Sequence, residues 1–227
     1  MRRSDLYTTV HKAIRSMLYE LGSKIQRNDF TDATATRELL AQLQQYLKLI
    51  NEHADYEERY IHPELRLQEP DLVSELENMH REIERYADVA VGIAAEVEQL
   101  SNPDELIVTG EKLHNAYNDY IAYLLSHINL EEAKSRPALW KHFTDDQLEA
   151  MRSNIMRSLT PEQSTIWIGG IFSSSEVNEL AQMVSMMKAS PMPPEAKEAI
   201  MNLARNNAGE ERWQRIQQRA GSQLVTH

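Results

Sequence analysis

Residues 39–60 read LLAQLQQYLKLINEHADYEERY, and this stretch decides the fold of the 227-residue chain. One stripe of residues runs along it at spacings of three and four: Leu39, Leu43, Tyr46, Ile50, His53, Glu57 and Tyr60. An α-helix has 3.6 residues per turn, so this period predicts a single amphipathic helix. The stripe is apolar first and then carries His53 and Glu57, which places an imidazole and a carboxylate one turn apart on the core-facing side.

Three other stretches show the same helical period. We predict helices over 5–27, 33–61, 70–100 and from 103 to Pro137. The polar run at 27–32 and Pro63 separate them, and Asn102-Pro103 is a strong helix start because Asn caps and Pro fits the first turn. Four helices of roughly 25 residues with short connections are typical of an all-α, up-down-up-down four-helix bundle.

The chain changes in composition after about residue 138, where all three tryptophans and seven of the ten methionines lie. Capping-box patterns start at Thr144, Thr160 and Ser173, and Gly169-Gly170 looks like a helix end or turn. The predicted short helices lie near 145–157, 161–171, 174–188, 194–206 and 209–220. We therefore divide the chain into a bundle domain at 1–140 and a helical C-terminal extension at 141–227, which we expect to pack on the bundle.

Composition excludes several classes of function. The formal net charge of −11 disfavours nucleic-acid binding, because an acidic surface repels phosphate backbones. The absence of cysteine excludes disulfides, thiolate catalysis and iron–sulfur clusters. The N-terminus leads into an amphipathic helix rather than a signal peptide, and no apolar run approaches the ~18 residues of a membrane span, so we expect a cytoplasmic protein.

Four histidines fall on core-facing stripes, one on each predicted bundle helix: His11, His53, His80 and His127. The last three are each followed four residues later by a glutamate: Glu57, Glu84 and Glu131. His11 and His80 lie early in their helices, whereas His53 and His127 lie late. In an antiparallel bundle these positions come to the same level, so we expect the side chains to converge.

Convergence of these side chains predicts a metal site. Burying several imidazoles and carboxylates costs several kcal/mol per ionised group unless a cation compensates. Imidazole and carboxylate together suit iron, manganese or zinc, and so many donors suit a pair of metals. The remaining histidines are His62, His114, His142 and His227. We do not expect them to be ligands; His62, for example, is nine residues after His53 and therefore half a turn out of phase.

With these residues the chain resembles the hemerythrin-like, or HHE cation-binding, family. The resemblance covers residues 5 to about 140 and rests on His11, His53-Ala-Asp-Tyr-Glu57, His80 and His127-Ile-Asn-Leu-Glu131. It implies a non-haem di-iron site with Glu57 and Glu131 as bridging carboxylates, and zinc or manganese as possible substitutes. It also implies activities on small ligands: binding or sensing of dioxygen, and reaction with nitric oxide or peroxide.

The chain departs from the oxygen carriers of that family at two positions. Those proteins have a second histidine where this chain has Glu84, and an aspartate five residues after the last histidine, which leaves Glu131 and Glu132 as alternatives. Glu84 either ligates a metal or stays unbound and leaves an open coordination position. The changes favour a reactive or sensing site over a pure oxygen carrier. Tyr60 and Tyr120 share the inner stripes; we expect core packing, with hydrogen bonding to a bound ligand as the alternative.

Two functional hypotheses follow. The first is a di-iron protein that binds or reacts with dioxygen, peroxide or nitric oxide. The second is an iron- or oxygen-responsive regulatory or structural module, in which metal occupancy stabilises the bundle. The sequence leaves open whether the chain is an enzyme, which small ligand is physiological and whether there is a protein partner.

Overall fold

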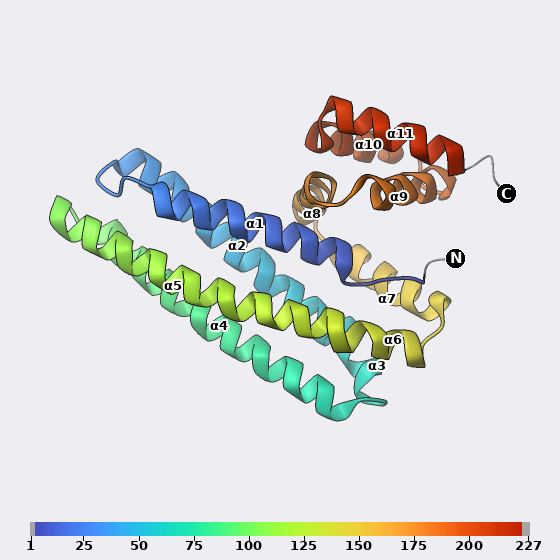
Figure 1. Ribbon diagram of the computed structural model, residues 1–227, viewed down its shortest axis with the longest axis horizontal. Coiled ribbons are helices and arrows are strands. Elements are labelled where there is room, and N and C mark those ends of the chain that lie inside the picture. The colour runs from blue at the N-terminus through green and yellow to red at the C-terminus, as the bar shows by residue number, and fades with distance from the viewer. Residues whose placement is uncertain (1–2, 224–227) are drawn as a thin grey trace. The chain divides into compact units, whose positions relative to one another are not determined.

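The computed structural model describes residues 3–223, with side chains described up to Gly221, and all regular structure in that range is helical (Figure 1). The prediction of an all-α fold is confirmed. The helices are α1 Thr8–Arg27, α2 Ala33–Tyr60, α3 His62–Arg66, α4 Pro70–Gln99, α5 Pro103–Leu130, the π-helical turn η1 Glu131–Ser135, α6 Arg136–His142, α7 Asp145–Ser158, α8 Pro161–Ser174, α9 Val177–Ala189, α10 Pro194–Ala208 and α11 Glu210–Gln223. Within the described range, no helix is long and apolar enough to span a bilayer.

Contacts group the chain into two compact units. The first contains Met17–Ser158 and the chain up to Tyr7, and the second contains Thr8–Ser16 and the chain from Leu159 onward. The expected boundary at residue 140 falls inside α6, and the division there stays a prediction. Packing of the extension on the bundle stays a prediction.

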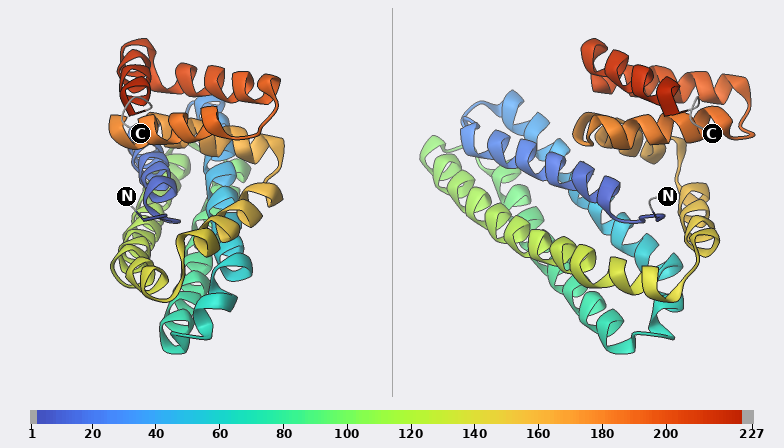
Figure 2. Two further views of the ribbon diagram at one scale, coloured as in Figure 1. Left: turned by 90° about the vertical axis from the view of Figure 1, so that its right-hand side faces the viewer. Right: turned by 45° about the vertical axis from the view of Figure 1, so that its right-hand side comes forward.

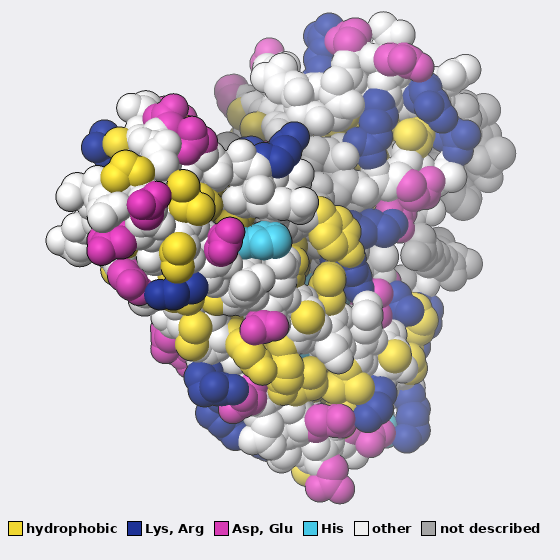
Figure 3. All heavy atoms as spheres, turned by 60° about the vertical axis from the view of Figure 1, so that its left-hand side comes forward, with side chains coloured by type: hydrophobic (Ala, Val, Ile, Leu, Met, Phe, Trp, Pro, Cys, Tyr) yellow, Lys and Arg dark blue, Asp and Glu magenta, His cyan; other side chains and the backbone are white. Residues whose placement is uncertain are grey.

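The first unit is built on α2, α4, α5 and the later part of α1, which run side by side in both views of Figure 2. Their inner stripes meet in a core that excludes solvent and includes Leu18, Leu21, Leu43, Leu76, Leu113 and Tyr117. The helix starts follow local chemistry: the Asp32 side chain accepts from the backbone N–H groups of Thr34 and Ala35, and Asn102 accepts from Asp104. These caps fix where α2 and α5 begin. Figure 3 shows acidic, basic and apolar side chains mixed over the outside of the bundle.

We expected the fourth long helix to end at Pro137, but it continues past that residue. After Leu130 it widens into the π-helical turn η1, in which the Arg136 N–H donates to the carbonyl of Glu131, five residues back. It then continues as α6, with Pro137 in the first turn of that helix. Single π turns inside helices occur frequently at functional sites, and this one begins at a predicted metal ligand.

One end of the first unit is closed by α3, α6 and α7. Apolar residues of these helices pack with Tyr7, Ile61 and Val73 of α4 in one cluster, whose other members are Leu65, Ala138, Leu139, Leu148 and Met151. The N-terminal segment is tied to it by polar contacts, because Trp140 Nε1 donates to the Ser4 carbonyl at 2.7 Å and Arg3 donates to the Phe143 carbonyl at 2.6 Å. Tyr7 is thereby held inside the bundle end.

The second unit has its own core, formed by α8 to α11. Its buried residues are Phe172, Leu180, Ala181, Val184, Ala204, Trp213, Ile216 and Ala220. The capping box predicted at Thr160 and Gln163 is present, but the one predicted at Ser173 is wrong: Glu176 and Glu179 form the box that starts α9. Gly169 does not end a helix either. It lies inside α8, where a Cβ would come within 3.0 Å of Asn207 Oδ1 on α10, so glycine permits close helix packing.

Two glycine substitutions test the packing of the first unit. A Cβ at Gly110 of α5 would overlap the Phe30 ring, whereas a Cβ at Gly92 of α4 meets nothing within 4 Å. Gly110→Ala is expected to destabilise the fold by about 1–3 kcal/mol, the usual cost of overpacking. Gly92→Ala, its matched control, is expected to stabilise the fold by about 0.5–1 kcal/mol, because alanine loses less backbone entropy in a helix. Urea denaturation curves measure both, and equal midpoints for the two variants would contradict the packing of Phe30 on α5.

Candidate metal centre

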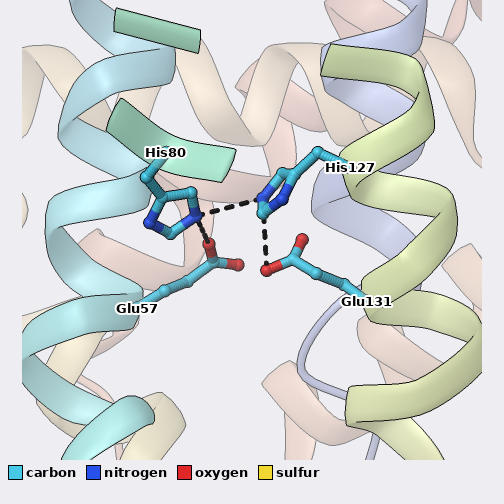
Figure 4. A group of neighbouring side chains, drawn as sticks. All are labelled: Glu57, His80, His127 and Glu131. Atoms are coloured by element: carbon cyan, nitrogen blue, oxygen red, sulfur yellow. Dashed lines mark hydrogen bonds and ion pairs between the residues drawn. The ribbon is translucent and has the colours of Figure 1, made fainter. Parts of the chain in front are cut away.

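Four side chains from three long helices and the π turn point toward one another in the first unit (Figure 4). Glu57 comes from α2, His80 from α4, His127 from α5 and Glu131 from the first position of η1. One donor atom of each lies within 4.8 Å of the others, and none of the four residues is more than 7% exposed. Two carboxylates and two imidazoles are therefore buried together at the closed end of the bundle.

The distances show how these groups face one another. The Nε2 atoms of His80 and His127 are 3.0 Å apart. His80 Nε2 lies 3.5 Å from Glu57 Oε2, and His127 Nε2 lies 3.4 Å from Glu131 Oε1. His53 Nε2 approaches the other Glu57 oxygen, Oε1, at 3.1 Å. The two oxygens of Glu57 thus face two different imidazoles.

Glu58 contacts the ring nitrogen of His80 that faces away from the cluster. Its Oε1 lies 2.8 Å from His80 Nδ1, on the opposite side of the ring from the cluster. A carboxylate on one ring nitrogen fixes the tautomer and orientation of the imidazole and leaves the other nitrogen for a metal. We did not assign Glu58 from the sequence; the signal was the second glutamate directly after Glu57.

The electrostatics of the cluster are dominated by its two buried carboxylates. Burial alone would raise the pKa of Glu57, but attraction to His53 and His80 outweighs it and holds that pKa well below the usual value. Burial alone would lower the pKa of His80, but Glu57, Glu131 and Glu58 raise it to about 9. The cluster therefore attracts positive charge. A divalent cation satisfies buried carboxylates and imidazoles together, so the donor set fits a metal.

Tyr7 is a further member of this environment that we did not identify from the sequence. Burial raises its pKa well above the usual value, and the charges of Glu131 and Glu57 raise it further. The phenol is fully buried and stays protonated. No motif marks a lone tyrosine before the first helix, so the sequence held no signal for it.

The remaining predicted residues are placed as follows. His53 is partly buried beside Glu57, with 14% of its side chain exposed. His11 is fully buried on α1, on the helix face that also carries Leu18 and Leu21. It falls in the segment Thr8–Ser16 that contacts assign to the second unit, so its ligation stays a prediction. Between the two glutamates left open, Glu131 belongs to the cluster and Glu132 is half-buried outside it.

Glu84 is not where we expected it. Its side chain is exposed and lies outside the cluster. The buried stripe of α4 runs through Leu76, His80, Ile83 and Ala87. Relative to His80, the other three lie about 20–60° round the helix on one side, whereas Glu84 lies about 40° round on the opposite side. We therefore leave Glu84 out of the ligand set.

His62 also departs from expectation. It is fully buried, and its ring stacks on that of His80 with centroids 5.5 Å apart and planes 11° apart. Counting its phase from His53 failed because α2 ends at Tyr60 and the chain turns before α3 begins. The other two described histidines lie elsewhere: His114 contacts Asn118 and His142 contacts Glu69.

The two tyrosines on the inner stripes differ in their surroundings. The Tyr60 hydroxyl hydrogen-bonds the Ser158 hydroxyl at 2.6 Å, so it is satisfied locally. Tyr120 is fully buried beside Tyr117, with ring centroids 6.0 Å apart. Neither hydroxyl has a described contact with the four-residue cluster.

Comparison with known proteins gives one match. The family model of the hemerythrin HHE cation-binding domain matches residues 3–139, which is more than half of the chain. No curated protein and no solved structure gives a significant match. The matched range contains every residue of the cluster and ends before α7.

Proposed function

This chain belongs to the hemerythrin HHE cation-binding family, and we propose that its bundle holds two non-haem irons that bind or react with dioxygen, peroxide or nitric oxide. The observation that carries the proposal is the position of Glu57, whose two oxygens face different imidazoles at 3.1 and 3.5 Å. The proposed ligands are His53, Glu57, His80, His127 and Glu131, with His11 as a further predicted ligand. Zinc or manganese suits the same donors as a substitute.

A pair of ions fits the donor set better than a single ion. Two buried carboxylates together offer four oxygens, and three imidazoles surround them. One divalent ion balances the charge of two carboxylates but leaves donors over, whereas two ions share the carboxylates as bridges. When bound, iron supplies redox chemistry and a coordination position for a small ligand.

The residues around the proposed ions fix the orientation of a ligand side chain and exclude water from the site. Glu58 fixes the His80 ring, and the apolar cluster around Tyr7 closes the bundle end against water. Burial and the charges of Glu131 and Glu57 raise the pKa of Tyr7, so it keeps its proton, and its hydroxyl lies next to that of Ser135. These features suit a reactive small ligand that must be shielded from solvent.

A regulatory module is the alternative, and one observation favours it. The chain from Leu159 onward lies outside the family match and forms its own core around Phe172 and Trp213. A second folded unit in the same chain as a metal-binding bundle gives the protein a surface on which to report metal occupancy. In this hypothesis the metal acts by stabilising the bundle rather than by reacting.

Metal content together with the visible spectrum tests the proposal. The full-length protein, loaded with ferrous iron and exposed to air, is expected to hold about two irons per chain, because the site offers donors for a carboxylate-bridged pair. It is expected to show charge-transfer bands that bleach on reduction. One zinc with a featureless spectrum, or no metal at all, would contradict the di-iron proposal and leave the regulatory or structural module.

A further inference from the structure

His62 is a buried histidine whose ring nitrogens lack close polar contacts among the described residues. It occupies the first position of α3, directly before Pro63, and is fully buried. Among residues 3–221, neither of its ring nitrogens has a partner within hydrogen-bond distance, and the Glu77 carboxylate lies 3.6 Å from Nδ1. Leaving a buried polar group unsatisfied costs about 1–3 kcal/mol, so an aromatic or aliphatic side chain would pack there more favourably. A histidine at this position therefore suggests that one of its ring nitrogens binds a metal ion.

The surroundings of His62 resemble those of His80. His62 Nδ1 lies 3.6 Å from Glu77 Oε1, and Glu77 is itself paired with Arg66. The corresponding nitrogen of His80 lies 2.8 Å from Glu58, while His80 Nε2 faces Glu57 and His127. Each imidazole thus has a carboxylate near Nδ1. This is the arrangement that second-sphere carboxylates give to metal-binding histidines, with Nε2 left for the metal.

We propose that His62 supplies a further imidazole nitrogen to the metals held by the bundle. The proposal rests on the metal centre proposed above and extends its ligand set to α3. The His62 ring lies nearly parallel to the His80 ring, with their centroids 5.5 Å apart. For comparison, the two ions of two-metal sites lie about 3.5–4 Å apart. Two parallel imidazoles at this spacing serve one ion each.

The charge and the donor count of the site agree with this assignment. Glu84 is exposed, so His80 is the one residue of α4 in the described donor groups. His62 stacks on His80. As a neutral donor it completes a coordination sphere without adding negative charge to the two buried carboxylates. His62 belongs to neither of the donor groups whose atoms lie within 4.8 Å of one another, so its assignment rests on its burial and on its stacking on His80.

Replacing His62 with phenylalanine separates a metal-ligand role from a packing role, because phenylalanine keeps a planar ring on His80 and removes both nitrogens. His114→Phe is the matched control, since His114 is half-buried away from the cluster and contacts only Asn118 among the described hydrogen bonds. The full-length proteins are loaded with cobalt(II). Metal content, affinity in competition with a chelator and the visible ligand-field spectrum are measured, with circular dichroism to check folding.

The wild type and His114→Phe are expected to bind two ions with the same spectrum. His62→Phe is expected to lose one ion or to bind it at least 10- to 100-fold more weakly, with a changed spectrum. Retention of both ions by His62→Phe, with affinity within about threefold and an unchanged spectrum, overturns the proposal. If His62→Phe does not fold, His62→Gln is judged by the same criteria. Failure of the wild type to bind metal would instead overturn the proposed function.

Discussion

Glu57→Gln is expected to abolish two-metal binding, while Glu84→Gln leaves it intact. The two glutamates have the same sequence context, each four residues after a core-stripe histidine, His53 or His80. Glu57 is 2% exposed and faces two imidazoles, whereas Glu84 is exposed. Glutamine matches glutamate in size but removes the charge and one bridging oxygen. We expect the affinity for metal to fall by more than about 100-fold in Glu57→Gln, beyond the usual loss for a second-sphere change.

Metal analysis after extensive dialysis, together with chelator competition, measures the difference between these variants. Because the substitutions are chemically identical, a general effect of removing negative charge from this acidic chain would change both variants alike. Full occupancy in Glu57→Gln would remove Glu57 from the ligand set. Loss of metal in Glu84→Gln would mean that α4 is rotated relative to the arrangement described here. His53→Ala and His127→Ala are expected to behave like Glu57→Gln.

Removal of the metal from the wild-type protein is expected to lower its stability strongly. Chelation leaves the buried charges of Glu57 and Glu131 to be balanced by the neighbouring imidazoles alone, and burying ionised carboxylates with less compensating charge is unfavourable. A ligand that binds only the native state stabilises it by RT ln(1 + [L]/Kd), which is about 4 kcal/mol at a free metal concentration 1,000 times Kd. Urea denaturation with and without chelator measures the shift.

Glu57→Gln provides the control for this second experiment. Its stability is expected to be insensitive to chelator, because it holds no metal to remove. Tryptophan fluorescence adds information on the two units, since Trp140 lies in the first and Trp167 and Trp213 lie in the second. A chelator-induced change confined to Trp140 would favour the di-iron protein, and a change at all three would favour the regulatory module. Equal stability of the wild type with and without metal would contradict a metal centre that supports the fold.

The sequence alone determined the helices and most of their ends. The stripe in residues 39–60 predicted α2 to within a residue of its end at Tyr60, and the caps at Asp32 and Asn102 sit where side-chain chemistry places them. These features are local, because a side chain three or four residues away, or a cap on the next two N–H groups, is set by helix geometry itself. The histidine and glutamate stripes likewise predicted that His80, His127, Glu57 and Glu131 converge, and the structure brings them together.

The tertiary structure decided which of the equivalent patterns face inward. His-x-x-x-Glu occurs at residues 53, 80 and 127, yet Glu57 and Glu131 are buried and Glu84 is not. Residues four apart differ by about 40° round a helix, so the rotation of each helix against its neighbours selects one of them. His62 is brought to His80 by a chain turn at Ile61, and η1 begins at Glu131 within a helix that continues past Pro137. Both depend on contacts between residues far apart in sequence, which local periodicity does not contain.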